Sequence, residues 1–105
     1  MILYNVTVNI DESVHKEWLE WMISKHIPDV LATGLFTGNK IYRIEEPSAE
    51  EGITYSIQYF CKSMEDYSKY RIEFAPSLQQ EHELKFGGKF FAFRTLLKEI
   101  ETGGK

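Results

Sequence analysis

The sequence predicts an α+β fold in which a four-stranded antiparallel sheet carries two helices on one face. Two segments, 2–10 and 53–61, alternate between apolar and polar residues as half-buried strands do. Two others, 11–33 and 63–86, place apolar residues at the three-and-four spacing of a helix that faces a core. The chain has 105 residues, which is the size of one domain, and we therefore expect a single domain over 1–105.

The first helix has recognisable boundaries and one interruption. Asp11 can cap its N-terminus, and Gly34 is a typical residue just beyond a helix C-terminus. Pro28 cannot occupy a regular helix interior, so it either kinks the helix or starts a short second turn over 28–33. The weaker pattern that follows predicts a second strand over 35–46.

The second half repeats the plan of the first. Ser63 is the expected cap of a second helix, which Pro76 interrupts or restarts and the glycine pair at 87–88 ends. A last strand is predicted over 89–100. The resulting order is βαββαβ, the split βαβ plan of ferredoxin-like folds. Right-handed crossovers then put the first and third strands at the centre of the sheet.

One face of such a sheet is not covered by its own helices. On the central strands this face presents neutral polar side chains, namely Asn5, Thr7, Asn9, Thr54, Ser56 and Gln58. A water-facing sheet is one reading. Solvated faces usually carry lysine and glutamate, however, and neutral hydroxyls and amides suit a place where water is scarce. We therefore expect a homodimer whose sheets face each other around a partly polar cavity. The last strand adds either Phe91 and Phe93 or Phe90 and Arg94 to this face.

Several stretches together resemble a known family over nearly the whole chain. They are YNVTVNI, the helix pattern W-x-x-W-M-x-x-x-H-I-P-D-V-L-A-T-G, YSIQY and FFAFRT. They resemble a bacterial family described as a domain of unknown function, which is similar in plan to the dimeric α+β barrel superfamily. That superfamily includes cofactor-free antibiotic-biosynthesis monooxygenases, muconolactone isomerase, EthD-like proteins and chlorite-dismutase-like haem enzymes. The resemblance implies a fold and carries no activity, and no residue here completes a catalytic motif of the characterised members.

His26 and Arg94 are the candidates for catalysis. His26 stands at a helix end and could act as a general acid or base, or it could simply be a packing or surface histidine favoured by the helix C-terminus. The nearby Asp29 could orient its imidazole or cap the restarted turn. Arg94 could hold a carboxylate or carbonyl oxygen in the cavity, or it could bridge to an acidic partner at the dimer seam.

Four residues of the open face are the candidates for ligand binding: Asn5, Thr7, Ser56 and Gln58. They could orient a small ligand, because binding pockets need a few convergent polar groups. They could equally satisfy one another across two strands. Trp18 and Trp21 are expected in the core, and His82 is expected at the surface among polar neighbours.

Composition and spacing argue against several functional classes. The net charge of -4 disfavours binding to nucleic acid or to an anionic membrane. His15 and His26 would lie about 16 Å apart along a helix, so no spacing resembles a metal site. We expect no metal and no cofactor, and a haem would require His26 as its ligand. Cys61 is the only cysteine, which is typical of the reducing cytoplasm, and a cytoplasmic location is the expectation.

The sequence leaves two functional hypotheses and does not decide whether the protein is an enzyme. In the first, a homodimer binds a small, partly apolar ligand in a cavity between sheet and helices. It would act as a cofactor-free oxygenase, isomerase or lyase, with His26 as proton shuttle and Arg94 as anion holder. In the alternative, the protein is a non-catalytic dimerisation or interaction module.

Overall fold

The computed structural model describes residues 1–103, and residues 104–105 lie outside that description. Its strands are β1 (Ile2–Ile10), β2 (Gly38–Arg43), β3 (Ile53–Cys61) and β4 (Phe90–Lys98). Its α-helices are α1 (His15–Trp21), α2 (Ile27–Leu31), α3 (Met64–Glu73) and α4 (Ala75–Phe86). The strand order is β2-β3-β1-β4, and every neighbouring pair is antiparallel. The predicted α+β plan, with the first and third strands at the centre, is confirmed.

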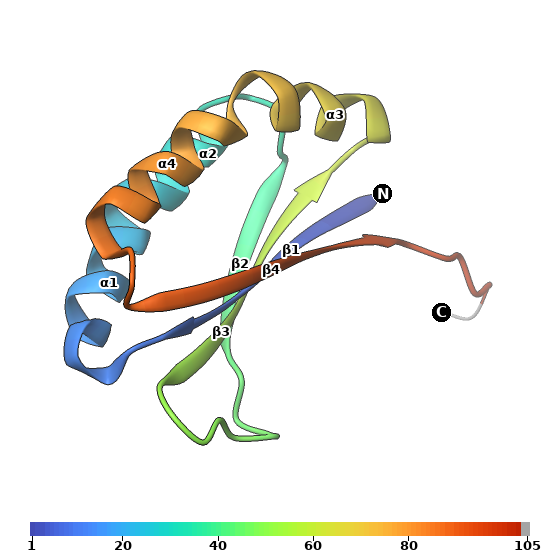
Figure 1. Ribbon diagram of the computed structural model, residues 1–105. Helices are drawn as coiled ribbons and strands as arrows, with labels where there is room; N and C mark the ends of the chain where they lie inside the picture. The colour runs from blue at the N-terminus through green and yellow to red at the C-terminus, as the bar shows by residue number, and fades with distance from the viewer. Residues whose placement is uncertain (104–105) are drawn as a thin grey trace.

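All the helices lie on one side of the sheet (Figure 1). The core lies between the two layers, because alternate side chains of the central strands point towards the helices. On these strands the buried core residues are Ile2, Tyr4, Val8, Ile10, Tyr55, Ile57, Tyr59 and Cys61. The helices contribute buried residues such as Trp18, Met22, Val30 and Tyr70. The strand alternation and the helical spacing seen in the sequence therefore produce a single hydrophobic layer.

The first helical region begins and ends at the predicted residues but changes geometry in the middle. Asp11 accepts a hydrogen bond from the Ser13 amide at 2.8 Å, and Gly34 has a positive φ of 80°. Residues Met22–His26 form a π-helical turn between α1 and α2, closed by the Ile27 amide on the Met22 carbonyl. Pro28 accounts for this turn, because it has no N–H and its ring clashes with the carbonyl four residues earlier.

The second helical region is divided at the predicted proline. The Ser63 side chain accepts a hydrogen bond from the Asp66 amide at 3.2 Å and caps α3. Pro76 lies in the first turn of α4, where a missing N–H costs nothing. Strand β2 is shorter than the predicted 35–46, because Phe36 turns under the helices and is only 8% exposed.

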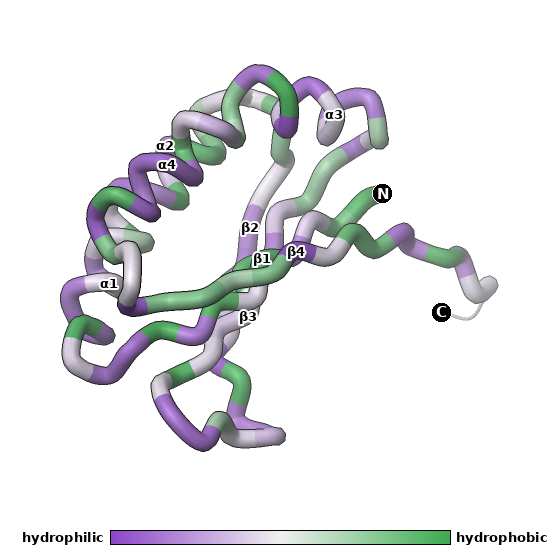
Figure 2. The backbone as a smooth tube through the Cα atoms, viewed as in Figure 1, coloured by the Kyte–Doolittle hydropathy of each residue, from purple (hydrophilic) through white to green (hydrophobic). Residues whose placement is uncertain are grey.

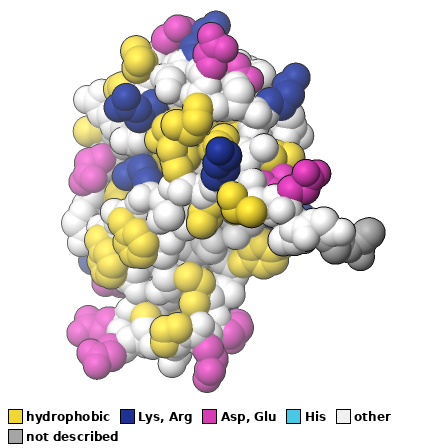
Figure 3. All heavy atoms as spheres, turned by 90° about the vertical axis from the view of Figure 1, so that its right-hand side faces the viewer, with side chains coloured by type: hydrophobic (Ala, Val, Ile, Leu, Met, Phe, Trp, Pro, Cys, Tyr) yellow, Lys and Arg dark blue, Asp and Glu magenta, His cyan; other side chains and the backbone are white. Residues whose placement is uncertain are grey.

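The register of β4 decides which of its residues reach the open face. Phe91 and Phe93 lie opposite Asn9 and Thr7 of β1, so they join the polar side chains of the open face. Arg94 lies opposite Val6 and faces the helices. Strand β4 is coloured as hydrophobic over its first half in Figure 2, because its two faces both begin with phenylalanine. Figure 3 views the open face, where hydrophobic groups are separated by uncharged polar surface.

In residues 1–103, none of the helices combines the length and the hydropathy needed to cross a membrane.

Candidate functional site

The π-helical turn places His26 between the helices and the sheet. His26 is the last residue of that turn and the N-cap of α2. Its ring lies 5.1 Å from the ring of Trp21 and 5.6 Å from that of His82, centroid to centroid. Nδ1 of His26 is buried and has no hydrogen-bond partner among the described residues. A buried nitrogen without a partner is costly and is uncommon outside functional positions.

His82 is buried, which corrects the expectation that it lies at the surface. It is only 5% exposed, although Gln79, Gln80 and Glu83 surround it in the sequence. Helix α4 turns this one polar position towards the sheet, in line with the buried Phe86 one turn later. A single histidine within a polar run gives no periodic signal, and the core-facing stripe of α4 is narrow.

Aromatic contacts and one hydrogen bond hold His82 in place. Its ring stacks on Phe90 with the centroids 4.0 Å apart and on Trp21 at 5.7 Å. The indole N–H of Trp18 donates to Nε2 of His82 at 2.9 Å. Trp18 and Trp21 are thus packing residues, as predicted, and they also form the surroundings of both histidines.

Burial controls the protonation of the two histidines. It lowers the pKa of His26 to about 4, helped by the positive charges of Arg94 and Lys25 and opposed by Asp29. Burial also lowers the pKa of His82 to about 4, and His26 and Arg94 add to the effect. Both imidazoles are therefore neutral near pH 7. A neutral imidazole can accept a proton at one nitrogen and donate one from the other.

Arg94 brings a positive charge to the same place. It is the central residue of β4 and points to the helix side of the sheet. Burial raises the pKa of the Tyr4 hydroxyl, and the neighbouring Arg94 guanidinium partly offsets this rise. Arg94 also acts electrostatically on Tyr70, whose pKa is raised chiefly by burial. His26, His82, Tyr4 and Arg94 therefore form one cluster.

The cluster surrounds a small cavity between the sheet and the helices. The cavity has a volume of about 30 Å³, and its polar lining residues are Tyr4, His26, Tyr59, Tyr70, Gln79, His82 and Arg94. Apolar side chains from both layers, including Val6 and Met22, complete the wall. A space of this size holds one or two water molecules. Convergent acid-base groups, a cation and apolar walls are the ordinary components of a site for a small organic molecule.

The four predicted ligand-binding residues lie on the opposite face of the sheet. The Ser56 hydroxyl donates to Oδ1 of Asn5 at 2.6 Å, and Nδ2 of Asn5 donates to Thr7 Oγ1 at 2.9 Å. The Gln58 amide donates to Ser56 Oγ at 3.3 Å. These residues satisfy one another across β1 and β3. The structure therefore brings His26 and Arg94 together and separates both from the residues of the open face.

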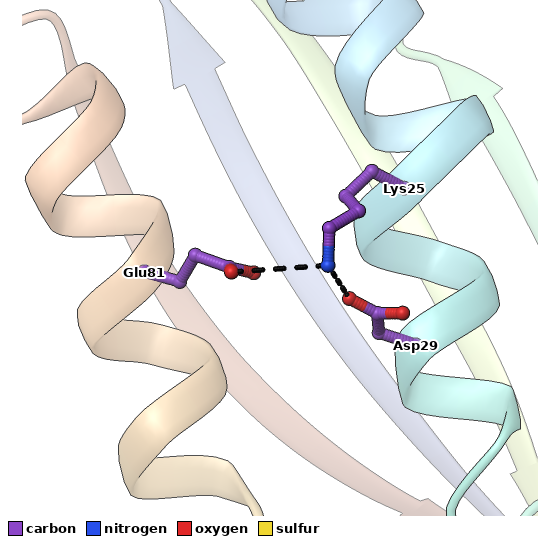
Figure 4. A network of polar contacts seen from close by, with 3 residues as sticks. All are labelled: Lys25, Asp29 and Glu81. Atoms are coloured by element: carbon purple, nitrogen blue, oxygen red, sulfur yellow. Dashed lines mark hydrogen bonds and ion pairs between the residues drawn. The ribbon is translucent and has the colours of Figure 1, made fainter.

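Asp29 pairs with a lysine. Lys25 binds Asp29 one turn later and also lies 3.8 Å from Glu81 of α4 (Figure 4). The N-terminus of α2 has no side-chain cap, so the capping role expected for Asp29 is wrong. The ion pairs are partly exposed and contribute little individually. They link the π-helical turn to α4 on the outer side of the two histidines.

Sequence comparison adds the family. The family described as "Domain of unknown function (DUF4286)" matches residues 1–100. The chain belongs to the DUF4286 family. No curated protein matches the sequence of this DUF4286 member.

Solved structures similar to this DUF4286 chain share its fold. A dimeric ferredoxin-like protein from an uncultured marine organism matches with a TM-score of 0.68 at 15% identity, covering 100% of both chains. An EthD family protein from Bacillus halodurans matches with a TM-score of 0.66 at 11% identity, over 95% of this chain and 100% of that one. A monooxygenase from Streptomyces coelicolor, in complex with nanaomycin D, matches with a TM-score of 0.58 at 11% identity, over 98% and 92%. These similarities confirm the ferredoxin-like, dimeric α+β barrel fold.

Proposed function

We propose that this DUF4286 protein binds a small, partly apolar molecule in the cavity between the sheet and the helices. The observation that supports this most is the buried Nδ1 of His26, which has no protein partner in residues 1–103 and belongs to a cavity-lining ring. A ligand hydroxyl or an acidic C–H would supply the missing partner. Monooxygenases with the same fold at 10–11% identity are consistent with a small-molecule site.

The chemistry that fits this cluster is proton transfer without a cofactor. Nδ1 of neutral His26 would accept a proton from the ligand, and Arg94 would stabilise the negative charge left on a neighbouring ligand oxygen. The ligand anion could then react with oxygen, be reprotonated elsewhere, or expel a leaving group. These outcomes correspond to an oxygenase, an isomerase and a lyase.

The protein is proposed to act as a homodimer through its open face. Large apolar side chains are exposed there, with Phe91 at 65%, Phe93 at 57% and Leu97 at 46%. The polar residues between them already satisfy one another, so a second sheet can cover them at little cost. At least two solved structures with this fold are described as dimeric ferredoxin-like proteins. Asn5, Thr7, Ser56 and Gln58 would line the space between the sheets, where they could also hold a second small molecule.

The self-contained hydrogen bonding of the open face also favours the alternative, a non-catalytic dimerisation module. In that case the sheet would exist to dimerise, and the cavity on the helix side would stay empty of ligand. The two functions differ in what they require of His26.

The test is a screen of small ring-containing alcohols, phenols and ketones against protein labelled with 5-fluorotryptophan. Trp21 lies against both histidines, so a ligand in the cavity should shift its ¹⁹F resonance. Val6 lines the cavity, whereas Val14 is a half-buried valine outside its lining. We expect ligands that bind wild type and Val14→Phe equally and lose most of their affinity for Val6→Phe. A screen without any such ligand, or ligands indifferent to Val6→Phe, would refute the proposal.

A further inference from the structure

A surface groove between α4 and β4 adjoins the cavity. The groove has a volume of about 410 Å³, and its lining includes Pro76, Gln80, Phe90 and Ala92. Binding sites for small organic molecules usually span roughly 300–1,000 Å³, so the groove has an adequate size. The inner cavity, at about 30 Å³, does not. A ligand that reaches the histidines must therefore place most of its body in the groove.

Three residues line both spaces and define their junction. They are Gln79 and His82 of α4 and Arg94 of β4. Any molecule that extends from the groove into the cavity must pass between these side chains. The atom it presents to His26 and His82 therefore lies close to the group it presents to Arg94.

Arg94 is a cation available to a ligand. The ion pairs of the described residues involve Lys25, Arg43 and Lys85 as their cations, and Arg94 takes part in none of them. The groove also contains the carboxylate of Glu83, but this group lies beside Gly87 at the C-terminal end of α4. Arg94 stands at the middle of β4 beside two histidines, His26 and His82, that are neutral near pH 7. The junction is thus locally positive in a chain whose net charge is -4.

The remaining groove walls select the body of the ligand. Phe90, Ala92 and Pro76 provide apolar surface, and Gln79 and Gln80 provide neutral amides. Such walls suit a ring or a short apolar chain rather than a second charged group. A carboxylate beside the reactive atom would match the guanidinium, which binds carboxylates through two parallel hydrogen bonds.

We infer that the ligand is a small organic acid with an apolar body, seated in the α4–β4 groove with its carboxylate on Arg94 and the adjoining carbon towards His26 and His82. This inference rests on the proposed ligand-binding function and names the class of molecule.

Phenylacetate and phenylacetamide provide the test, because they share a shape and differ in charge. Binding is measured by titration calorimetry and by the ¹⁹F resonances of Trp18 and Trp21 in wild type, Arg94→Gln and Arg71→Gln. Arg71 is an exposed arginine of α3 and serves as the matched charge control. We expect phenylacetate to bind wild type and Arg71→Gln alike and to bind Arg94→Gln about tenfold or more weakly, as loss of a charge-assisted hydrogen bond implies. Phenylacetamide should bind weakly to all three.

Other results overturn the inference in distinguishable ways. If both compounds bind wild type equally and Arg94→Gln changes neither, the site takes uncharged ligands and the proposed function survives alone. If Arg71→Gln weakens phenylacetate as much as Arg94→Gln, the effect is one of overall charge. If neither compound binds wild type, the carboxylate inference fails, and the screen with Val6→Phe decides the proposed function separately.

Discussion

The indole N–H of Trp18 donates a hydrogen bond to Nε2 of His82 at 2.9 Å, joining α1 to α4. Because Nε2 accepts this bond, a neutral His82 carries its proton on Nδ1. Protonation of His82 would turn Nε2 into a second donor and would break the contact. The pair therefore fixes both the charge and the tautomer of a histidine that lines the cavity.

Removal of the donor should free His82 to titrate. In Trp18→Phe, the neutral imidazole loses a buried hydrogen bond, and we expect the pKa of His82 to rise from about 4 towards its ordinary 6.5. The free energy of unfolding should fall by about 2 kcal/mol, the cost of leaving a buried polar atom unsatisfied and some space unfilled. An NMR titration of the imidazole and urea unfolding measure the two effects.

Trp21→Phe is the matched control for this prediction. Trp21 contacts His82 by stacking, with the ring centroids 5.7 Å apart. Its replacement should cost stability by loss of packing and should change the pKa of His82 much less. Equal pKa changes in the two variants would show that burial alone, without the hydrogen bond, governs His82.

Acid should destabilise the protein before most carboxylates titrate. The folded-state pKa values of His26 and His82 are about 4, below the ordinary value of 6.5. The unfolded chain therefore binds these two protons more tightly than the folded protein does. The stability due to the neutral histidines is complete above pH about 6.5 and is lost as the pH falls towards 4. For His26 the loss is on the order of 3 kcal/mol.

Comparison with one variant isolates this contribution. We expect the free energy of unfolding of wild type to fall steadily between about pH 6.5 and 4, and we expect that of His26→Phe to fall less steeply. Urea unfolding at several pH values gives both curves. Parallel curves would mean that His26 titrates alike in the folded and unfolded protein.

The fold could be predicted because its signals repeat along the chain. Each central strand alternates over nine residues, and Asp11, Ser63 and Gly34 are specific boundary residues. The exception was β2, whose expected start was misplaced because a buried Phe36 gives the same apolar signal in a loop as in a strand.

The site was predictable only in part. His26 and Arg94 stood out as single polar residues among apolar ones, and the structure places both beside the cavity. The face of Arg94 could not be assigned, because Phe90, Phe91 and Phe93 make both sides of β4 apolar. His82 was missed because its polar neighbours hid a position whose burial is decided by the packing of α4 on the sheet.

A charge on the open face should prevent dimerisation. Phe93 is 57% exposed on that face and would be buried between two sheets. In Phe93→Glu, association would bury an unpaired carboxylate, which costs several kcal/mol. We expect wild type to sediment as a dimer and the variant as a monomer. Leu84→Glu is the control, because Leu84 is 80% exposed on α4 and lies away from this face. A monomeric wild type, or equal dissociation of the control, would contradict the proposed dimer.

Two glycines with positive φ separate backbone strain from steric clash. Gly34 has a φ of 80°, and a Cβ there would meet nothing within 4 Å. Gly52 has a φ of 75°, and a Cβ there would lie 2.5 Å from Oδ1 of Asn9 and 2.8 Å from the Ile10 carbonyl oxygen. Alanine at either position must adopt a left-handed conformation, which costs about 1–2 kcal/mol.

Gly52→Ala should therefore destabilise the protein more than Gly34→Ala. The added methyl group would also displace Asn9, whose Nδ2 donates to the Glu51 carbonyl at 3.0 Å and to Thr54 Oγ1 at 3.1 Å. We expect a further loss of about 1–2 kcal/mol in urea unfolding, because the backbone carbonyl of Ile10 cannot move without disturbing β1. Equal losses in the two variants would show that the loop before β3 shifts freely, and that the contact of Gly52 with β1 does not hold it in place.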